Sequence, residues 1–146
     1  MRRLVMLIAV LALALGACNS DSTSDTGPVE GTDRCEEADP LVLDHIRGGL
    51  TVDTVTIDWG FTVKSNDYPD VWIVTAAGEG EAFGEGFGTW AIQASAWPEQ
   101  YIATLAVDEV AKAITDFGAE SGLIVTPNTD GYRSAQACII ERLDNS

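Results

Sequence analysis

Two stretches of this 146-residue chain decide its fold: VTIDWGFTV at residues 55–63 and VWIVTAA at residues 71–77. In the first stretch, apolar residues alternate strictly with polar residues or glycine, which predicts an antiparallel strand with one wet face. The second stretch is apolar on both sides and rich in β-branched residues, so it predicts the central strand of a sheet. The polar residues 65–70 between them predict a turn.

The segments around these two strands extend the sheet and add a helix. A third strand is expected near residues 87–94, after the glycine-rich stretch 78–86. Three consecutive strands with short links predict a meander. Upstream, Asp39 followed by Pro40 is typical of a helix start, and the glycines at 48 and 49 are typical of a helix end. We therefore expect a short helix over residues 40–48.

The second half of the chain allows two interpretations. Apolar residues at helical spacing favour a helix from about residue 102 to 117, with Gly118 as its stop. The alternative is a strand over residues 101–107, with Asp108 capping a shorter helix.

Further on, residues 123–126 are a candidate short strand, and Asp130 is expected to cap a final helix over residues 131–143. The chain is thus expected to form one α+β domain over residues 34–146. Its antiparallel sheet would have three or more strands and pack against two or three helices.

The N-terminus carries an export signal. Two arginines precede an apolar run at residues 4–15, which is followed by LGAC at residues 15–18. Twelve helical residues rise only about 18 Å, whereas a bilayer core needs about 30 Å, so the run is too short to span a membrane. An ordinary cleaved signal peptide is the alternative interpretation, because Ala17 alone could serve a soluble-protein peptidase.

LGAC resembles the lipobox of bacterial lipoproteins. This resemblance implies that residues 1–17 are a signal peptide and that Cys18 is lipidated and becomes the mature N-terminus. The protein would then be anchored to the extracytoplasmic face of the cell membrane through the lipid on Cys18. Residues 18–33, rich in Ser, Thr, Asp, Gly and Pro, would be a flexible linker.

Charge restricts the possible partners. The formal net charge is −15, and removal of Arg2 and Arg3 with the signal would take it to −17. A surface this acidic argues against nucleic acid and against anionic lipid, because both are bound by basic patches. The acids are scattered along the chain, which is typical of a solvated surface that keeps an exported protein soluble.

With Cys18 assigned to lipid, Cys35 and Cys138 remain. Two thiols in an exported domain most simply pair, so we expect a disulfide that ties the start of the domain to its last helix.

The glycine-rich stretch is the most unusual segment. Residues 78–88 hold five glycines and the three glutamates Glu79, Glu81 and Glu85. Carboxylates wrapped around a loop could bind calcium, which takes six to eight oxygen ligands. A charged hairpin connection with glycines in positive-φ turns explains the same residues, and we expect this simpler structure.

Other chemistry has little support in the sequence. His45 is the only histidine and is expected to be a partly buried helix residue, so a histidine-based metal site is not expected. Of the four tryptophans, which could stack on a carbohydrate, Trp59 and Trp72 are expected in the core. Trp90 is ambiguous, and Trp97 is expected to be exposed in a loop.

The mature domain also resembles small uncharacterised exported lipoproteins of high-GC Gram-positive bacteria. The resemblance is carried by VWIVTA at residues 71–76, by GTWA at residues 88–91 and by Asp130-Gly131 before a helical cysteine. It implies no activity. We expect a non-catalytic binding module without a cofactor, whose partner is a protein or polymer of the envelope. The alternative is a hydrolase that uses a pair of acidic residues on an envelope polymer.

Overall fold

The computed structural model describes residues 31–84 and 86–146. Its elements are, in chain order, η1 (Thr32–Arg34), β1 (Glu36–Glu37), α1 (Pro40–Gly48), β2 (Trp59–Lys64), β3 (Val71–Ala77), β4 (Gly88–Ala96), β5 (Gln100–Ala106), α2 (Glu109–Ile114), η2 (Ala119–Ser121) and α3 (Tyr132–Asp144). The predicted signal sequence and the predicted lipidation site Cys18 lie outside the described residues.

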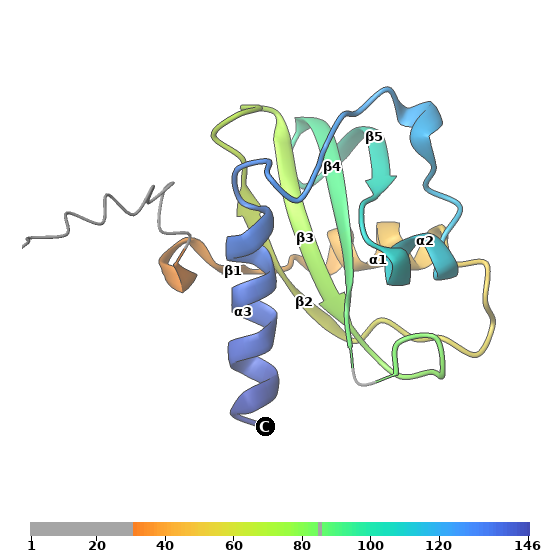
Figure 1. Ribbon diagram of the computed structural model, residues 1–146. Coiled ribbons are helices and arrows are strands. Elements are labelled where there is room, and N and C mark those ends of the chain that lie inside the picture. Colours follow the sequence, from red (N-terminus) through yellow and green to blue (C-terminus); the bar gives the residue numbers. More distant parts are fainter. Residues whose placement is uncertain (1–30, 85) are drawn as a thin grey trace, which may run out of the picture.

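The five strands form one antiparallel sheet in the order β1-β2-β3-β4-β5, which is a meander (Figure 1). The expected central strand is confirmed as β3, and the expected α+β fold is confirmed as well. The strand predicted from residue 55 begins instead at Trp59. Residues 55–58 still run beside the end of β3, because Asp58 N donates to Ala77 O (3.0 Å).

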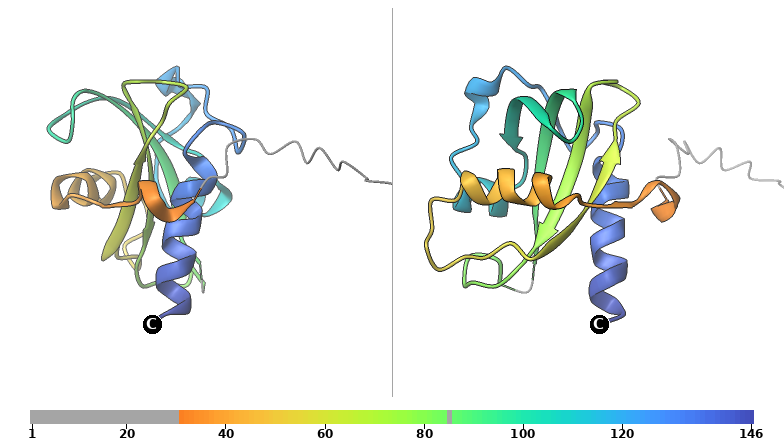
Figure 2. Two further views of the ribbon diagram at one scale, coloured as in Figure 1. Left: turned by 90° about the vertical axis from the view of Figure 1, so that its left-hand side faces the viewer. Right: turned by 180° about the vertical axis from the view of Figure 1, so that it is seen from behind.

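Helices cover both faces of the sheet: α1 and α3 lie on opposite faces (Figure 2), and the buried residues of α2 pack in the same cluster as those of α1. Side chains alternate between the two faces of a strand. On β3, Val74 therefore packs in the cluster of α1 and α2, and Ile73 in the cluster of α3. Trp90 is fully buried in the first cluster, where its Nε1 donates to Thr115 Oγ1 (3.2 Å).

The predicted first helix is confirmed with its predicted bounds, because α1 begins at Pro40 and ends at Gly48. Asp39 caps it: its Oδ1 accepts a hydrogen bond from Leu41 N (2.8 Å).

The helix favoured from residue 102 is wrong. Residues 100–106 form β5, and Asp108 caps the short helix α2 by accepting from Ala111 N (2.8 Å), as the alternative had it. The misleading pattern has a physical cause. Gln93 pairs with Ala103 and Ala94 with Tyr101, so Ile102 is an extra, bulged residue and is 61% exposed. The bulge breaks the two-residue alternation that would have identified a strand.

Two further expectations fail in the segment before α3. Residues 123–126 are irregular and join no strand among the described residues. Asp130 does not cap α3, because the helix begins after Gly131, which has φ +88° and provides no side-chain cap. The Asp130 carboxylate binds Arg34 instead.

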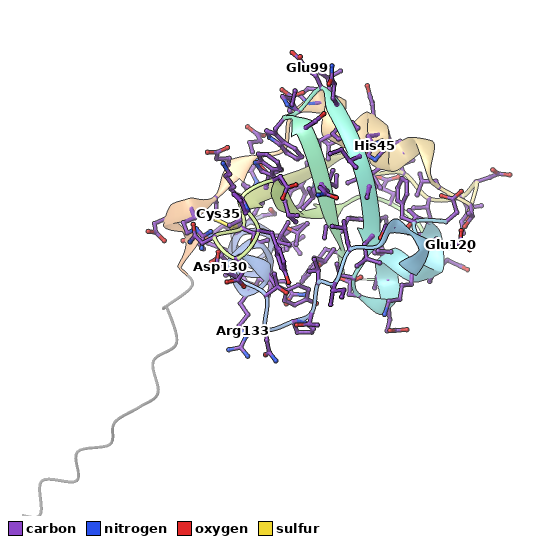
Figure 3. All side chains as sticks on the ribbon, turned by 90° about the horizontal axis from the view of Figure 1, so that it is seen from above. Cys35, His45, Glu99, Glu120, Asp130 and Arg133 are labelled. Carbon is purple, nitrogen blue, oxygen red and sulfur yellow. A yellow bond between two sulfur atoms is a disulfide. The ribbon has the colours of Figure 1, made fainter. Side chains whose placement is uncertain are left out.

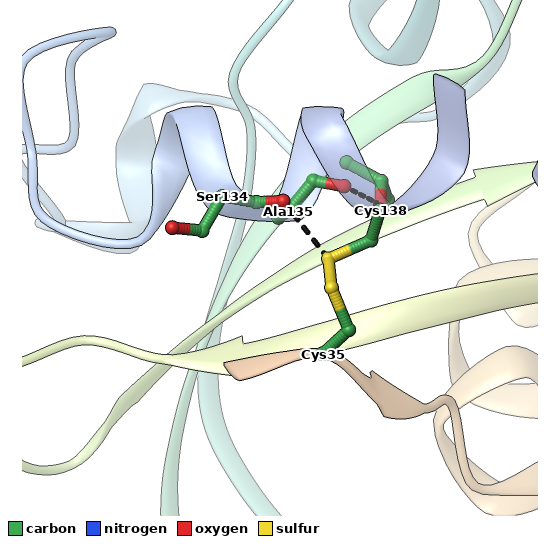
Figure 4. Close-up of a disulfide and its surroundings, with 5 residues drawn as sticks. Cys35, Ser134, Ala135 and Cys138 are labelled. Carbon is green, nitrogen blue, oxygen red and sulfur yellow. Dashed lines mark hydrogen bonds between the residues drawn. A yellow bond between two sulfur atoms is a disulfide. The ribbon is translucent and has the colours of Figure 1, made fainter. Parts of the chain in front are cut away.

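The predicted disulfide is confirmed. Cys35 and Cys138 are joined, with their Cα atoms 6.0 Å apart and a separation of 103 positions in sequence (Figure 4). The bridge attaches the segment before β1 to the middle of α3. Across residues 31–84 and 86–146, no helix combines the length and the apolar character needed to cross a bilayer.

Candidate functional site

An open groove of about 340 Å³ lies beside the disulfide, between the η1 segment and the C-terminal half of α3. The half-buried or buried part of its lining is apolar and consists of Phe61, Cys35 and Cys138. The exposed part is polar and consists of Thr32, Glu141, Arg142 and Asn145. Small-molecule sites are typically concave and mostly apolar, with a few polar groups that fix orientation, and occupy about 300–1,000 Å³. The groove has this composition and lies near the lower end of that size range.

Neighbouring groups hold the apolar floor in place. Phe61 points from β2 toward α3, and its ring meets Trp59 edge-on, with 6.0 Å between the ring centroids. The disulfide forms the adjoining wall, and its Cys138 is only 3% exposed (Figure 4). Polarisable sulfur and an aromatic ring are favourable surfaces for an apolar or aromatic ligand.

The polar rim carries both signs of charge. Glu141 and Arg142 are adjacent on α3, and adjacent helix positions do not face each other. Among the described residues, neither side chain is in an ion pair. The end of the helix is satisfied by its own side chains, because Asn145 Nδ2 donates to Glu141 O (2.6 Å) and Ser146 Oγ donates to Arg142 O (2.7 Å).

A partly buried ion pair fixes the η1 wall of the groove. Arg34 Nη1 and Nη2 donate to the two carboxylate oxygens of Asp130 at 3.0 and 2.9 Å, and Arg34 also donates to Lys64 O. Asn66 N donates to Asp130 Oδ2 (2.7 Å). The hydrogen bonds from Arg34 hold the pKa of Asp130 below its usual value. Sequence analysis missed this pair because 96 residues separate its members, and no local pattern links them.

The tryptophans do not form a flat stacking platform. Trp97 is half-buried rather than exposed, and its ring lies parallel to Trp72 with 4.5 Å between centroids. Lys64 Nζ lies over the Trp72 ring, 5.3 Å from its centroid. Trp72 and Trp59 are half-buried rather than core residues. Because Trp72 has both Trp97 and Lys64 as ring neighbours, it offers a sugar little free aromatic face.

His45 is a partly buried helix residue, as predicted. Its ring stacks on Tyr101 at 4.1 Å and on Phe117 at 5.2 Å, and its Nε2 is 2.7 Å from Thr104 Oγ1. Burial lowers the pKa of His45. Figure 3 shows the residue between α1 and the sheet, on a different side of the molecule from Cys35.

The structure describes all of the glycine–glutamate segment, residues 78–88, except Glu85, one of the three candidate calcium ligands. Glu79 and Glu81 are exposed, and the chain turns at Gly80 and Gly84, which have φ of +132° and +58°. Glu85 lies outside the described residues. Within the described residues, no group of three or more His, Cys, Asp or Glu side chains is placed to hold a metal ion. Calcium binding was the alternative to the expected hairpin connection, and it stays untested because Glu85 is not among the described residues.

Comparisons with known proteins found no family model, no curated protein and no solved structure that matches this chain.

Proposed function

We propose that the protein is a lipid-anchored lipoprotein of the extracytoplasmic membrane face that binds a partner of the cell envelope without catalysis. The groove beside the disulfide is the observation that carries the binding part of this proposal. It combines an apolar floor with polar groups of both charges at its rim, and the ion pair of Arg34 with Asp130 fixes one wall.

The anchoring part rests on the sequence LGAC at residues 15–18. One acyl chain binds a membrane marginally, whereas two or more hold it firmly. Cys18→Ala should therefore release the protein from the membrane or leave it mislocalised. Labelling cells with a fatty-acid analogue tests this, and incorporation that survives the substitution would contradict the lipoprotein proposal.

The binding part can be tested inside cells by photo-crosslinking. A benzoylphenylalanine placed at Thr32, on the groove rim, should form adducts that one placed at Glu120 does not form. Glu120 is an exposed residue on the opposite side of the molecule from Cys35 and serves as the matched control (Figure 3). Equal adducts at both positions, or none at Thr32, would contradict binding at the groove.

A carboxylate-pair hydrolase has less support than the binding module. Such an enzyme needs two carboxyl groups facing each other across a cleft. Glu141 is the one carboxylate among the described residues that line the groove.

A further inference from the structure

We infer that the groove beside the disulfide recognises a small zwitterion of the amino-acid type, with an apolar or aromatic side chain. This inference rests on the proposed binding function and names the class of ligand. It follows from three features of the groove: its apolar floor, the opposite charges on its rim, and its size.

The charges on the rim favour a zwitterion over simpler ligands. A ligand with only a carboxylate would meet Arg142 but would be repelled by Glu141, and a ligand with only an ammonium group would have the reverse problem. A neutral apolar ligand would gain nothing from either charge, because both side chains are exposed and would stay in water. A ligand that carries an ammonium and a carboxylate gives each rim group a complementary charge.

Arg142 is the basic residue among the described residues that line the groove. The whole chain has 23 acidic residues against 8 basic ones. Within the described part of the chain, Arg34, Arg47 and Lys112 each pair with a carboxylate. Lys64, Arg133 and Arg142 are in no ion pair there, and of these three Arg142 is the one that lines the groove. Its position places a cation on the rim of the groove.

The apolar floor of the groove indicates the side chain of the ligand, and the volume of the groove indicates its size. Phe61 and the disulfide can accept an aliphatic or aromatic side chain. A volume of about 340 Å³ suits a single residue-sized molecule.

Three probes that share one side chain separate the two charges. L-phenylalanine carries both, N-acetyl-phenylalanine carries only the carboxylate, and phenylalanine amide carries only the ammonium. Calorimetric titration of the full-length protein in detergent should show at least tenfold tighter binding of phenylalanine than of either derivative. Equal binding of the three probes, or no binding of phenylalanine, would overturn the inference.

Substitutions on the rim should remove one discrimination at a time. Glu141→Gln should abolish the preference for phenylalanine over its N-acetyl derivative but keep the preference over the amide. Arg142→Gln should do the reverse. The controls Glu120→Gln and Arg133→Gln change exposed residues that do not line the groove, and they should leave both preferences unchanged. Preferences that persist in Glu141→Gln and Arg142→Gln would overturn the assignment of the two rim charges.

The apolar floor is tested separately. Phe61→Ala should weaken all three probes by a similar factor, since they share the side chain, and a variant that binds all three as tightly as the parent protein would overturn this part of the inference.

Failure of this inference can be told apart from failure of the proposed function. The crosslinking experiment at Thr32 makes no assumption about ligand charge. Adducts at Thr32 without a preference for the zwitterion would overturn the ligand class and leave the binding module standing. Absence of those adducts would overturn the binding module itself.

Discussion

The Asp130 carboxylate connects three segments that are far apart in sequence. It accepts two hydrogen bonds from Arg34, at the start of the domain, and one from the backbone of Asn66, in the link between β2 and β3. The backbone N–H of Asp130, just before α3 begins, donates to Asp67 Oδ2 (2.8 Å). A single side chain therefore positions the η1 segment, the β2–β3 link and the start of α3.

Asp130→Asn should destabilise the protein by about 1.5–3 kcal/mol at pH 7, the usual range for a hydrogen bond to a charged group. Because the pKa of Asp130 is lowered on folding, its carboxylate stabilises the folded state fully above the unfolded pKa of about 3.9. This stabilisation is lost as the pH falls through the folded pKa. Urea denaturation at pH 7 and at pH 2–3 should show the difference between variant and parent shrink at low pH. The exposed Asp144→Asn is the control.

His45 should make stability depend on pH in a different range. Burial lowers its folded pKa, so the unfolded chain binds a proton more readily between the two pKa values. Stability should therefore fall as the pH drops from 7 through the unfolded value of about 6.5. His45→Gln should flatten this part of the profile in thermal melts between pH 7.5 and 5.5. An unchanged slope in the variant would show that another group causes it.

At the scale of elements, the sequence predicted the strands β2, β3 and β4, whereas it predicted the second half of the chain only in part. The alternation at residues 55–63 and the apolar run at 71–77 identified β2 and the central β3, because each strand follows a local rule. The bulge at Ile102 hid β5, since it breaks that rule within seven residues. Asp130 was predicted to cap the last helix, but its carboxylate binds Arg34, which is far away in the sequence.

The residues of the groove were likewise predictable only where a local sequence pattern identified them. Phe61 was placed on the apolar side of its strand, and Cys35 was paired with Cys138 from the sequence alone. The roles of Glu141 and Arg142 depend on α3 packing against β2 beside the η1 segment. No spacing in the sequence reports that packing, so these two residues could not be recognised beforehand.

The cap of α2 can be tested at this scale. Asp108→Ala should cost about 1 kcal/mol of stability, because it removes the hydrogen bond from Ala111 N at the helix start. Asp108→Asn should retain most of the stability, since asparagine is also a good N-cap. Chemical denaturation of both variants measures the difference, and equal losses would mean that the charge of Asp108, rather than its capping bond, stabilises the helix.

At the scale of the whole molecule, the disulfide closes a loop that contains most of the domain. In the chain-entropy account, a loop of about 100 residues stabilises the folded state by about 4–5 kcal/mol, against a total of about 5–15 kcal/mol for a typical domain. The double variant Cys35→Ser/Cys138→Ser should lose most of this amount in denaturant unfolding.

Thiol labelling gives an independent check of the bridge. The protein should show no free thiol at Cys35 or Cys138 under denaturing conditions until it is reduced. Two reactive thiols at these positions would contradict the disulfide.

The position of the disulfide also determines how the domain would carry a mechanical load. β1 pairs with β2 over only two residues, Glu36 and Glu37, so a pull on the chain at Gly31 could easily peel such a short strand from the edge of the sheet. A pull from Gly31 reaches Cys35 before it reaches β1, and the disulfide passes the force to Cys138 on α3. The sheet lies within the bridged loop and is shielded from this tension. A protein held by its N-terminal side could thus be strained by its surroundings without its fold being unravelled from that end.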